Sequence, residues 1–184
     1  MSRRNDLRHD MRRWSLIVAL YTPLVMPCAT VAASEPVDNP AIDIAAYLRV
    51  SRQALDDRDR HRVSENEFID MSREAGTVVL DARSKQKYDE LHIKGAISLS
   101  FPDIALASLS NALPDKDARI LIYCNNNFVN AQGPFPSKLP SASLNISTYI
   151  ALYDYGYRNV YELGPQLDIG ASLLEFESSP APSQ

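Results

Sequence analysis

A single cysteine stands at the end of the most apolar segment of the chain. Residues 119–123 read RILIY, a run typical of a buried strand, and Cys124 follows directly. A thiol that leaves a parallel strand can be surrounded by unpaired N–H groups, which stabilise a thiolate or a persulfide anion without a metal. Cys124 is therefore the candidate catalytic nucleophile. The alternative is a buried, inert thiol, which is common for cysteine.

Three asparagines come immediately after this cysteine, at Asn125, Asn126 and Asn127. Asn adopts positive φ more readily than any residue except Gly, so the run predicts a tight turn around the sulfur, and the side-chain amides would add donors for a substrate. Phe128 and Lys138 are assigned to the same substrate site. Lys138 is the one cation in 125–142 and would neutralise an anionic substrate over Cys124, although it is equally compatible with a solvated lysine.

The start of the chain has the pattern of an export signal. Arg12 and Arg13 precede an uncharged run over 14–34, and small residues at 31–33 suit a signal peptidase. We expect cleavage after Ala33 and a periplasmic or secreted protein with no integral membrane segment after cleavage. An uncleaved membrane anchor is the alternative, which prolines at 23 and 27 within the run disfavour.

Composition excludes several function classes. The 184 residues suffice for one domain. Without 1–33, which hold five Arg and two Asp, the chain keeps 14 basic and 21 acidic side chains and a formal charge of −7. This balance argues against nucleic acid or an anionic membrane surface as a partner.

Cysteine and histidine usage narrows the chemistry further. Cys124 is the one cysteine after residue 33, so an internal disulfide is impossible and a redox exchange role has no resolving cysteine. His61 and His92 do not fall at a metal-ligand spacing beside it, and we expect neither a metal nor another cofactor.

The elements that must position Cys124 alternate between strands and helices. A first helix is predicted after a cap at Asn39, and a solvated connection over 56–62 follows it. Ser64 and Glu67 form a capping box for a second helix, which stops at Gly76. The remaining expected elements are strands over 77–80, 96–99, 119–123 and 159–163, helices over 85–91, 103–111 and 143–155, a loop over 124–144 and a disordered tail from 178. This alternation predicts a parallel α/β sheet, whose ligand crevice lies at the carboxyl ends of the strands.

The long segment after Cys124 is expected to act as a lid or a binding loop, since long irregular segments in compact domains usually serve such roles. Phe128, Phe135 and Leu139 would be unfavourable in water. We therefore expect the segment to fold back over the carboxyl ends of the strands and to cover Cys124.

The stretch 78–84, VVLDARS, together with Tyr88 and the HIKGA stretch at 92–96, resembles the rhodanese family, whose members carry D-x-R-x3-E/K-[YF]-x3-H-I-x-G-A in this order. The later stretch 152–161 and the strand leading to Cys124 are also similar to family segments, so the resemblance spans roughly 60–165. It implies a single α/β rhodanese-like domain, a small parallel sheet with helices on both faces. It also implies that Cys124 carries sulfur from a small sulfane-sulfur donor such as thiosulfate to a thiol acceptor. On this basis we assign 1–33 to the signal peptide, 34–62 to a helical extension, 63–170 to the domain and 171–184 to a C-terminal tail.

The chain departs from the family pattern after the cysteine. Active members usually have C-x-x-G-x-[RS] there. In this chain the first Gly after Cys124 is Gly133, and the first Arg after it is Arg158. A phosphatase or arsenate reductase on this fold would need C-x5-R, but position 130 is Asn. A second hypothesis is accordingly a non-catalytic binding module with a remodelled loop over 125–142, which would hold a protein partner through Phe128, Val129, Phe135 and Leu139.

Several other residues have competing interpretations. Asp81, Arg83 and His92 are expected to position the loops beside Cys124 rather than to react, with Asp81 in an ion pair or cap and His92 bonded to backbone. Tyrosines at 149, 153 and 157 form either a sugar-stacking face or, more commonly, core packing. The triplet 145–147 matches a glycosylation acceptor but is interpreted as helix capping.

Overall fold

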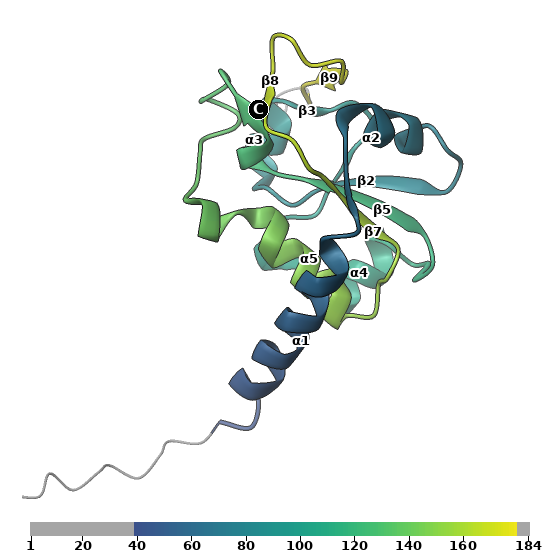
Figure 1. Cartoon of the computed structure of the whole chain (residues 1–184), viewed down its shortest axis with the longest axis vertical. Coiled ribbons are helices and arrows are strands. Elements are labelled where there is room, and N and C mark those ends of the chain that lie inside the picture. Colours follow the sequence, from purple (N-terminus) through teal and green to yellow (C-terminus); the bar gives the residue numbers. More distant parts are fainter. Residues whose placement is uncertain (1–38, 180–184) are drawn as a thin grey trace, which may run out of the picture. The chain divides into compact units, whose positions relative to one another are not determined.

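The computed structural model describes residues 39–179, and Figure 1 shows their arrangement. The predicted signal peptide over 1–33, its cleavage after Ala33 and the last residues of the tail, 180–184, lie outside this range. Within the range, no helix is both long enough and apolar enough to cross a membrane.

A parallel sheet of five strands forms the centre of the domain. Its order is β1-β7-β5-β2-β4, and every neighbouring pair is parallel. The strands are β1 (Arg62–Val63), β2 (Thr77–Asp81), β4 (Ile97–Ser98), β5 (Arg119–Tyr123) and β7 (Val160–Leu163). Because β2 and β5 are short apolar runs, they fit strands that are covered on both faces. The predicted parallel α/β architecture is confirmed, and Cys124 leaves the middle strand.

Helices cover both faces of this sheet (Figure 1). On one face, α1 (Ile44–Arg58), α4 (Leu106–Ala112) and α5 (Leu144–Asp154) pack on alternate strand residues such as Ile120 and Ile122. On the other face, α2 (Glu65–Ser72) and α3 (Lys85–Glu90) lie over the residues between, such as Leu121. Alternation of side chains along a strand therefore assigns each core residue to one of two clusters.

Local signals set most helix ends. The Ser64–Glu67 capping box is present, Ser84 caps α3, and Gly76 has a φ of +82°. The first helix differs from the prediction. It begins after Asp43, whose carboxylate accepts the Ala46 N–H, rather than after a cap at Asn39.

The segment predicted as a solvated connection over 56–62 is largely structured instead. The first helix continues to Arg58, and Arg62 begins an edge strand of the sheet. The Arg58 guanidinium pairs in a two-point contact with the buried carboxylate of Glu162. A run of charged residues looks solvated in sequence, but here one of its arginines pairs with a buried carboxylate 104 positions later in the chain.

Two further pairs of short strands close the domain. β3 (His92–Ile93) pairs antiparallel with β9 (Phe176–Glu177), and β6 (Phe128–Val129) pairs parallel with β8 (Leu167–Asp168). Residues up to Glu177 are thus part of the folded domain, although the sequence placed 171–184 in a tail. The predicted loop 124–144 also contains 3-10 helices at Asn125–Asn127 and Pro140–Ala142. A third, Phe101–Asp103, precedes α4, which begins at Leu106 and not at 103 as predicted.

Candidate active site

Cys124 lies at the carboxyl end of the central strand β5, and its side chain is completely buried. Its Sγ atom is 3.3 Å from the Oγ atom of Ser143. Ser143 directly precedes α5 at the N-cap position, but its hydroxyl makes no capping hydrogen bond to that helix. The hydroxyl is therefore available to the thiol, a contact that sequence reasoning missed because nothing local links residues 19 positions apart.

The three asparagines form a 3-10 turn and not the left-handed turn that was predicted. Asn127 N–H donates to the Cys124 carbonyl, and Phe128 N–H donates to the Asn125 carbonyl. In the described range, Asn130 is the one residue other than Gly with positive φ. The prediction of positive φ at 125–127 is wrong because a right-handed 3-10 turn supplies the same reversal without it.

Asn127 fastens the segment after Cys124 to the rest of the fold. Its Oδ1 accepts the Cys124 N–H at 2.9 Å and the Asn145 side-chain amide at 3.0 Å. Its Nδ2 donates to the carbonyls of Leu163 at 2.7 Å and Pro165 at 3.2 Å. All of these partners are protein atoms, so Asn127 has no polar atom left for a substrate. Its position fits a structural role better than the predicted role in substrate binding.

Asn145 belongs to this same network. It lies in the first turn of α5, 3% exposed, and its Nδ2 is bonded to Asn127, so the predicted capping role of the 145–147 triplet is wrong. The Asn145 Oδ1 has no hydrogen-bond partner in the described part of the chain. Because its donor nitrogen points inward, the glycosylation alternative also finds no support.

Two hydrogen bonds join Asn126, near the start of the insertion over 125–142, to the backbone of Lys138 near its end. Its Nδ2 donates to the Lys138 carbonyl at 2.9 Å, and Lys138 N–H donates to its Oδ1 at 3.2 Å. The Lys138 ammonium forms no ion pair with any residue of the described range. The Lys138 side chain is thus the one charged group that the insertion offers to a ligand.

The apolar residues of the insertion do not gather over the thiol as predicted. Phe128 and Phe135 are each 1% exposed and pack with Tyr123 and Phe176 in the cluster beneath α2 and α3. The contact of Cys124 with Ser143 instead points to the α5 face of the sheet. Leu139 is 73% exposed, contrary to its expected burial. Cys124 is covered, but strand β6 carries Phe128 onto the opposite face of the sheet, and Phe135 packs on it there.

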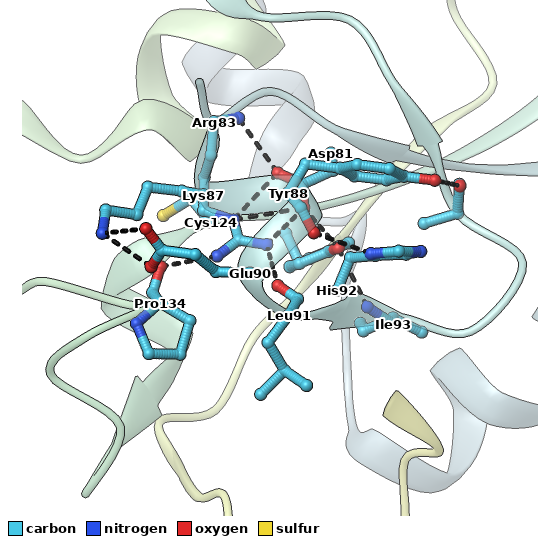
Figure 2. A network of polar contacts seen from close by, with 12 residues as sticks. Asp81, Arg83, Lys87, Tyr88, Glu90, Leu91, His92, Ile93, Cys124 and Pro134 are labelled. Atoms are coloured by element: carbon cyan, nitrogen blue, oxygen red, sulfur yellow. Dashed lines mark hydrogen bonds and ion pairs between the residues drawn. The ribbon is translucent and has the colours of Figure 1, made fainter. Parts of the chain in front are cut away.

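Asp81 and Arg83 form a buried ion pair beside the end of β5, as Figure 2 shows. Arg83 Nη2 donates to Asp81 Oδ2 at 2.6 Å, and Nε also donates to the Asp81 carboxylate. Nη2 donates in addition to the Leu91 carbonyl at 2.7 Å, and Nη1 donates to the Pro134 carbonyl at 2.8 Å. The Arg83 Cζ atom also lies 3.9 Å from the centre of the Phe135 ring. Arg83 therefore ties β2, the turn before β3 and the insertion together. This geometry supports the expected positioning role.

Tyr123 extends this pair into the core. Its hydroxyl donates to Asp81 Oδ2 and accepts the Ile93 N–H at 3.1 Å. Burial first, and then the negative charge of Asp81, raises the pKa of the Tyr123 hydroxyl well above its usual value. Tyr123 thus stays neutral and acts as a hydrogen-bonded strut next to Cys124.

His92 is a structural residue in this geometry. It is 3% exposed, its Nδ1 donates to the Tyr88 carbonyl at 2.7 Å, and its ring stacks on Tyr88 with 3.7 Å between ring centres. The expected bond to backbone is present. Its Nε2 lies 3.5 Å from Glu177 Oε1 and so contacts the C-terminal strand.

A hollow of about 380 Å³ opens beside the cysteine segment. Asn125 forms part of its wall, and so does Leu144, the residue after Ser143. Lys138 also lines it. The predicted site residues Asn125 and Lys138 thus meet in one place, whereas Phe128 is buried in the core and the polar atoms of Asn127 are bonded to protein atoms.

Comparison with known proteins fits this arrangement. The family model for the rhodanese-like domain matches residues 64–163, more than half of the chain. The chain belongs to the rhodanese-like domain family. No curated protein sequence matches it.

Three solved structures are similar to the chain. A rhodanese with anions from E. coli is 19% identical, with a TM-score of 0.39 over 55% of this chain and 98% of that chain. A rhodanese-like domain from Anabaena sp. is 21% identical, with a TM-score of 0.46 over 67% and 86%. A thiosulfate sulfurtransferase from Pseudomonas aeruginosa is 22% identical, with a TM-score of 0.46 over 71% of this chain but 23% of that chain.

A second hollow, of about 290 Å³, also borders the segment after Cys124, through Asn126 and Asn127. Ser143, Asn145 and Glu162 line it, and the Glu162 carboxylate is already paired with Arg58. Within the described range, no group of three or more His, Cys, Asp or Glu residues could hold a metal ion.

The tyrosines of the proposed stripe belong mainly to the core. Tyr149 and Tyr157 are each 1% exposed, and their hydroxyls donate to Asp57 and to the Leu113 carbonyl. Core packing is therefore the correct interpretation of the spacing, and a sugar-stacking face is excluded for these two rings.

Proposed function

We propose that this rhodanese-like domain is a sulfurtransferase or persulfide carrier that works through Cys124. The observation that carries the proposal is the position of the thiol: it is at the carboxyl end of the central parallel strand, with a hydroxyl within hydrogen-bond reach. Ligand chemistry in open parallel sheets takes place at this edge.

The loading step is a nucleophilic displacement on sulfur. The Cys124 thiolate attacks the outer sulfur of thiosulfate, a new S–S bond forms at Sγ, and sulfite leaves with the electron pair of the broken bond. With a polysulfide donor, the shortened polysulfide is the leaving group instead. A hydroxyl that donates to a sulfur anion stabilises it, and Ser143 is placed to do so. The product is a Cys124 persulfide.

The unloading step reverses the roles. A thiolate acceptor attacks the outer sulfur of the persulfide, the bond from that sulfur to Sγ breaks, and Sγ leaves with the electron pair and then takes a proton. Asn125 and Lys138 are the substrate-binding residues of this proposal because both line the adjacent hollow. The thiol is buried, so substrate contact requires a small opening of the covering segments, and the Asn126–Lys138 pair is their clasp.

The proposal places the reaction outside the cytoplasm. An uncharged run after Arg12 and Arg13 and small residues before Ser34 support export with cleavage after Ala33. N-terminal sequencing of the protein from its native host would begin at Ser34 if this is right, and at or near Met1 or Met11 if the segment is kept.

A single-turnover assay tests the activity. Reduced protein mixed with thiosulfate should release sulfite in an amount equal to the protein. A thiol acceptor added afterwards should take up the sulfur from the Cys124 persulfide. Cys124→Ser should release none. Background sulfite with thiosulfate, together with no persulfide on Cys124 after treatment with any other sulfane donor, would refute the proposal.

The alternative, a non-catalytic binding module, is favoured by one observation, the complete burial of the thiol. Of the apolar residues assigned to a partner surface, Leu139 is strongly exposed, whereas Phe128 and Phe135 are in the core. Under this alternative, Leu139→Ser would abolish capture of a partner and native Cys124 would resist thiol reagents. Retained capture, or rapid alkylation of Cys124, would count against it.

A further inference from the structure

The hollow beside Cys124 is larger than an inorganic donor needs. Its volume is about 380 Å³, within the range of roughly 300 to 1,000 Å³ typical of pockets for organic ligands. A water molecule accounts for about 30 Å³ of liquid, so the few heavy atoms of thiosulfate would leave most of this hollow empty.

The walls of the hollow are mainly apolar. Phe101 and Pro102 come from the 3-10 helix after β4, Pro136 from the insertion, and Leu144 from the start of α5. Such a surface suits an organic body rather than a hydrated ion. Because Pro136 comes from the insertion, the hollow depends on the segment in which this chain departs from the compact family pattern.

The charged side chains that line the hollow are all cationic, but they differ in whether a carboxylate already pairs with them. Arg83 is neutralised by Asp81, and Lys87 contacts Glu90. The Lys138 ammonium has no carboxylate partner in the described range and is the cation left for a ligand. The charged part of the lining therefore fits an anionic group.

Asn125 supplies an independent sign of a ligand. Its side chain is 3% exposed and lines the hollow, yet its Oδ1 has no hydrogen-bond partner in the described part of the chain. A buried amide oxygen without a partner is unfavourable, by about 1 to 3 kcal/mol in typical proteins. A bound molecule that offers an N–H or O–H donor would satisfy it.

We infer that this hollow binds the sulfur acceptor, and that the acceptor is an organic thiol with an apolar body and an anionic group such as a carboxylate. The inference rests on the proposed function. Asn125 follows Cys124, and Leu144 follows Ser143, whose Oγ is 3.3 Å from Sγ, so a ligand in the hollow lies against the residues next to both. Its thiolate would attack the outer sulfur of the Cys124 persulfide, and Sγ would leave with the electron pair of the broken bond.

A binding measurement tests the hollow without any sulfur chemistry. In the full-length Cys124→Ser protein, calorimetry would compare 3-phenylpropanoate with 3-phenylpropan-1-ol, which has the same body without the charge. We expect tighter binding of the anion. Lys138→Met should weaken the anion about three- to five-fold, as an exposed ion pair would, and leave the alcohol unchanged. Lys94→Met, at an exposed lysine outside the hollow, is the matched control.

The apolar wall has its own control. Phe101→Ala should weaken 3-phenylpropanoate but not propanoate, which lacks the ring, because burial of the ring contributes the difference. Equal affinity of 3-phenylpropanoate and 3-phenylpropan-1-ol, or an effect of Lys138→Met on both, would overturn the inference.

A kinetic arm separates this inference from the proposed function. The persulfide form should pass its sulfur faster to 3-mercaptopropanoate than to 2-mercaptoethanol or cysteamine, and Lys138→Met should remove the preference. Selective binding of the anion to a protein that never loads sulfur would support the hollow and refute the sulfurtransferase. Sulfur transfer at equal rates to all three thiols would support the sulfurtransferase and overturn the inference.

Discussion

The Sγ atom of Cys124 and the Oγ atom of Ser143 are 3.3 Å apart, and the first turn of α5 has no side-chain cap from that serine. An N-cap serine ordinarily accepts a backbone N–H of its own helix. Here it faces the thiol instead. The Ser143 hydroxyl therefore serves the sulfur and is not needed to cap α5.

Replacing Ser143 should change the chemistry more than the stability. Ser143→Ala removes the hydroxyl that faces Sγ but no capping bond, so its free energy of unfolding should stay within about 0.5 kcal/mol of the native value. Loss of a donor to a charged sulfur should slow persulfide formation roughly ten-fold. Stopped-flow sulfite release would measure this, with Ser143→Thr as the variant that keeps a hydroxyl. A large loss of stability with an unchanged rate would show that the hydroxyl serves packing alone.

Substitutions of the neighbouring residues Asn126 and Asn127 should differ in how much they destabilise the protein. Asn127→Ala leaves the Cys124 N–H and the carbonyls of Leu163 and Pro165 without their partner, at a cost of about 2 to 4 kcal/mol. Asn126→Ala opens an exposed clasp to Lys138 and should cost about 1 kcal/mol or less. Urea unfolding measures both.

The same clasp should control access to the thiol. Native Cys124 should react much faster with N-methylmaleimide than with a bulky maleimide that has the same reacting group, because the thiol is fully covered. Asn126→Ala should narrow this difference. Equal rates in the native protein would show that the insertion does not restrict access.

Arg83 should be among the residues most costly to replace. Arg83→Met leaves the buried Asp81 carboxylate unpaired and should destabilise the protein by about 3 to 5 kcal/mol. Asp81→Leu combined with Arg83→Met should recover part of this loss, since neither charge is then left alone. Arg119→Met, at an exposed pair with Glu74, is the control and should cost about 1 kcal/mol or less. Additive losses at 81 and 83 would contradict the coupling.

Tyr123 should make the free energy of unfolding depend on pH. Its pKa is raised in the folded state, first by burial and then by Asp81. The unfolded chain therefore ionises first as the pH rises, so the contribution of Tyr123 is complete below its ordinary pKa and is lost above it. Tyr123→Phe should be less stable than the native protein at about pH 8, and the gap should narrow at about pH 10.5. A gap that widens between these two pH values would contradict this assignment.

Local patterns in the sequence were enough for the framework of the site. The apolar run before Cys124, the Ser64 capping box and the Ser84 cap each depend on neighbouring residues, and each is present in the structure. The order of strands and helices also fixes which edge of the sheet receives Cys124.

The details around the sulfur depend on partners distant in the sequence. Ser143 meets Cys124 across 19 positions, and Asn127 meets Leu163 across 36. The burial of Phe128 depends on β6, a two-residue strand paired with Leu167–Asp168, and two residues carry no periodicity. Propensity alone suggested a left-handed asparagine turn, but the hydrogen bonds of Asn127 select a 3-10 turn instead.

The central claim is that Cys124 carries a sulfane sulfur, and the mass of the intact protein tests it most directly. After incubation with thiosulfate or a polysulfide and removal of excess donor, the account predicts the addition of one sulfur atom. The added sulfur should map to the peptide that contains Cys124, disappear on treatment with a thiol, and be absent from Cys124→Ser. An unchanged mass with every donor, or an adduct that persists in Cys124→Ser, would contradict the account.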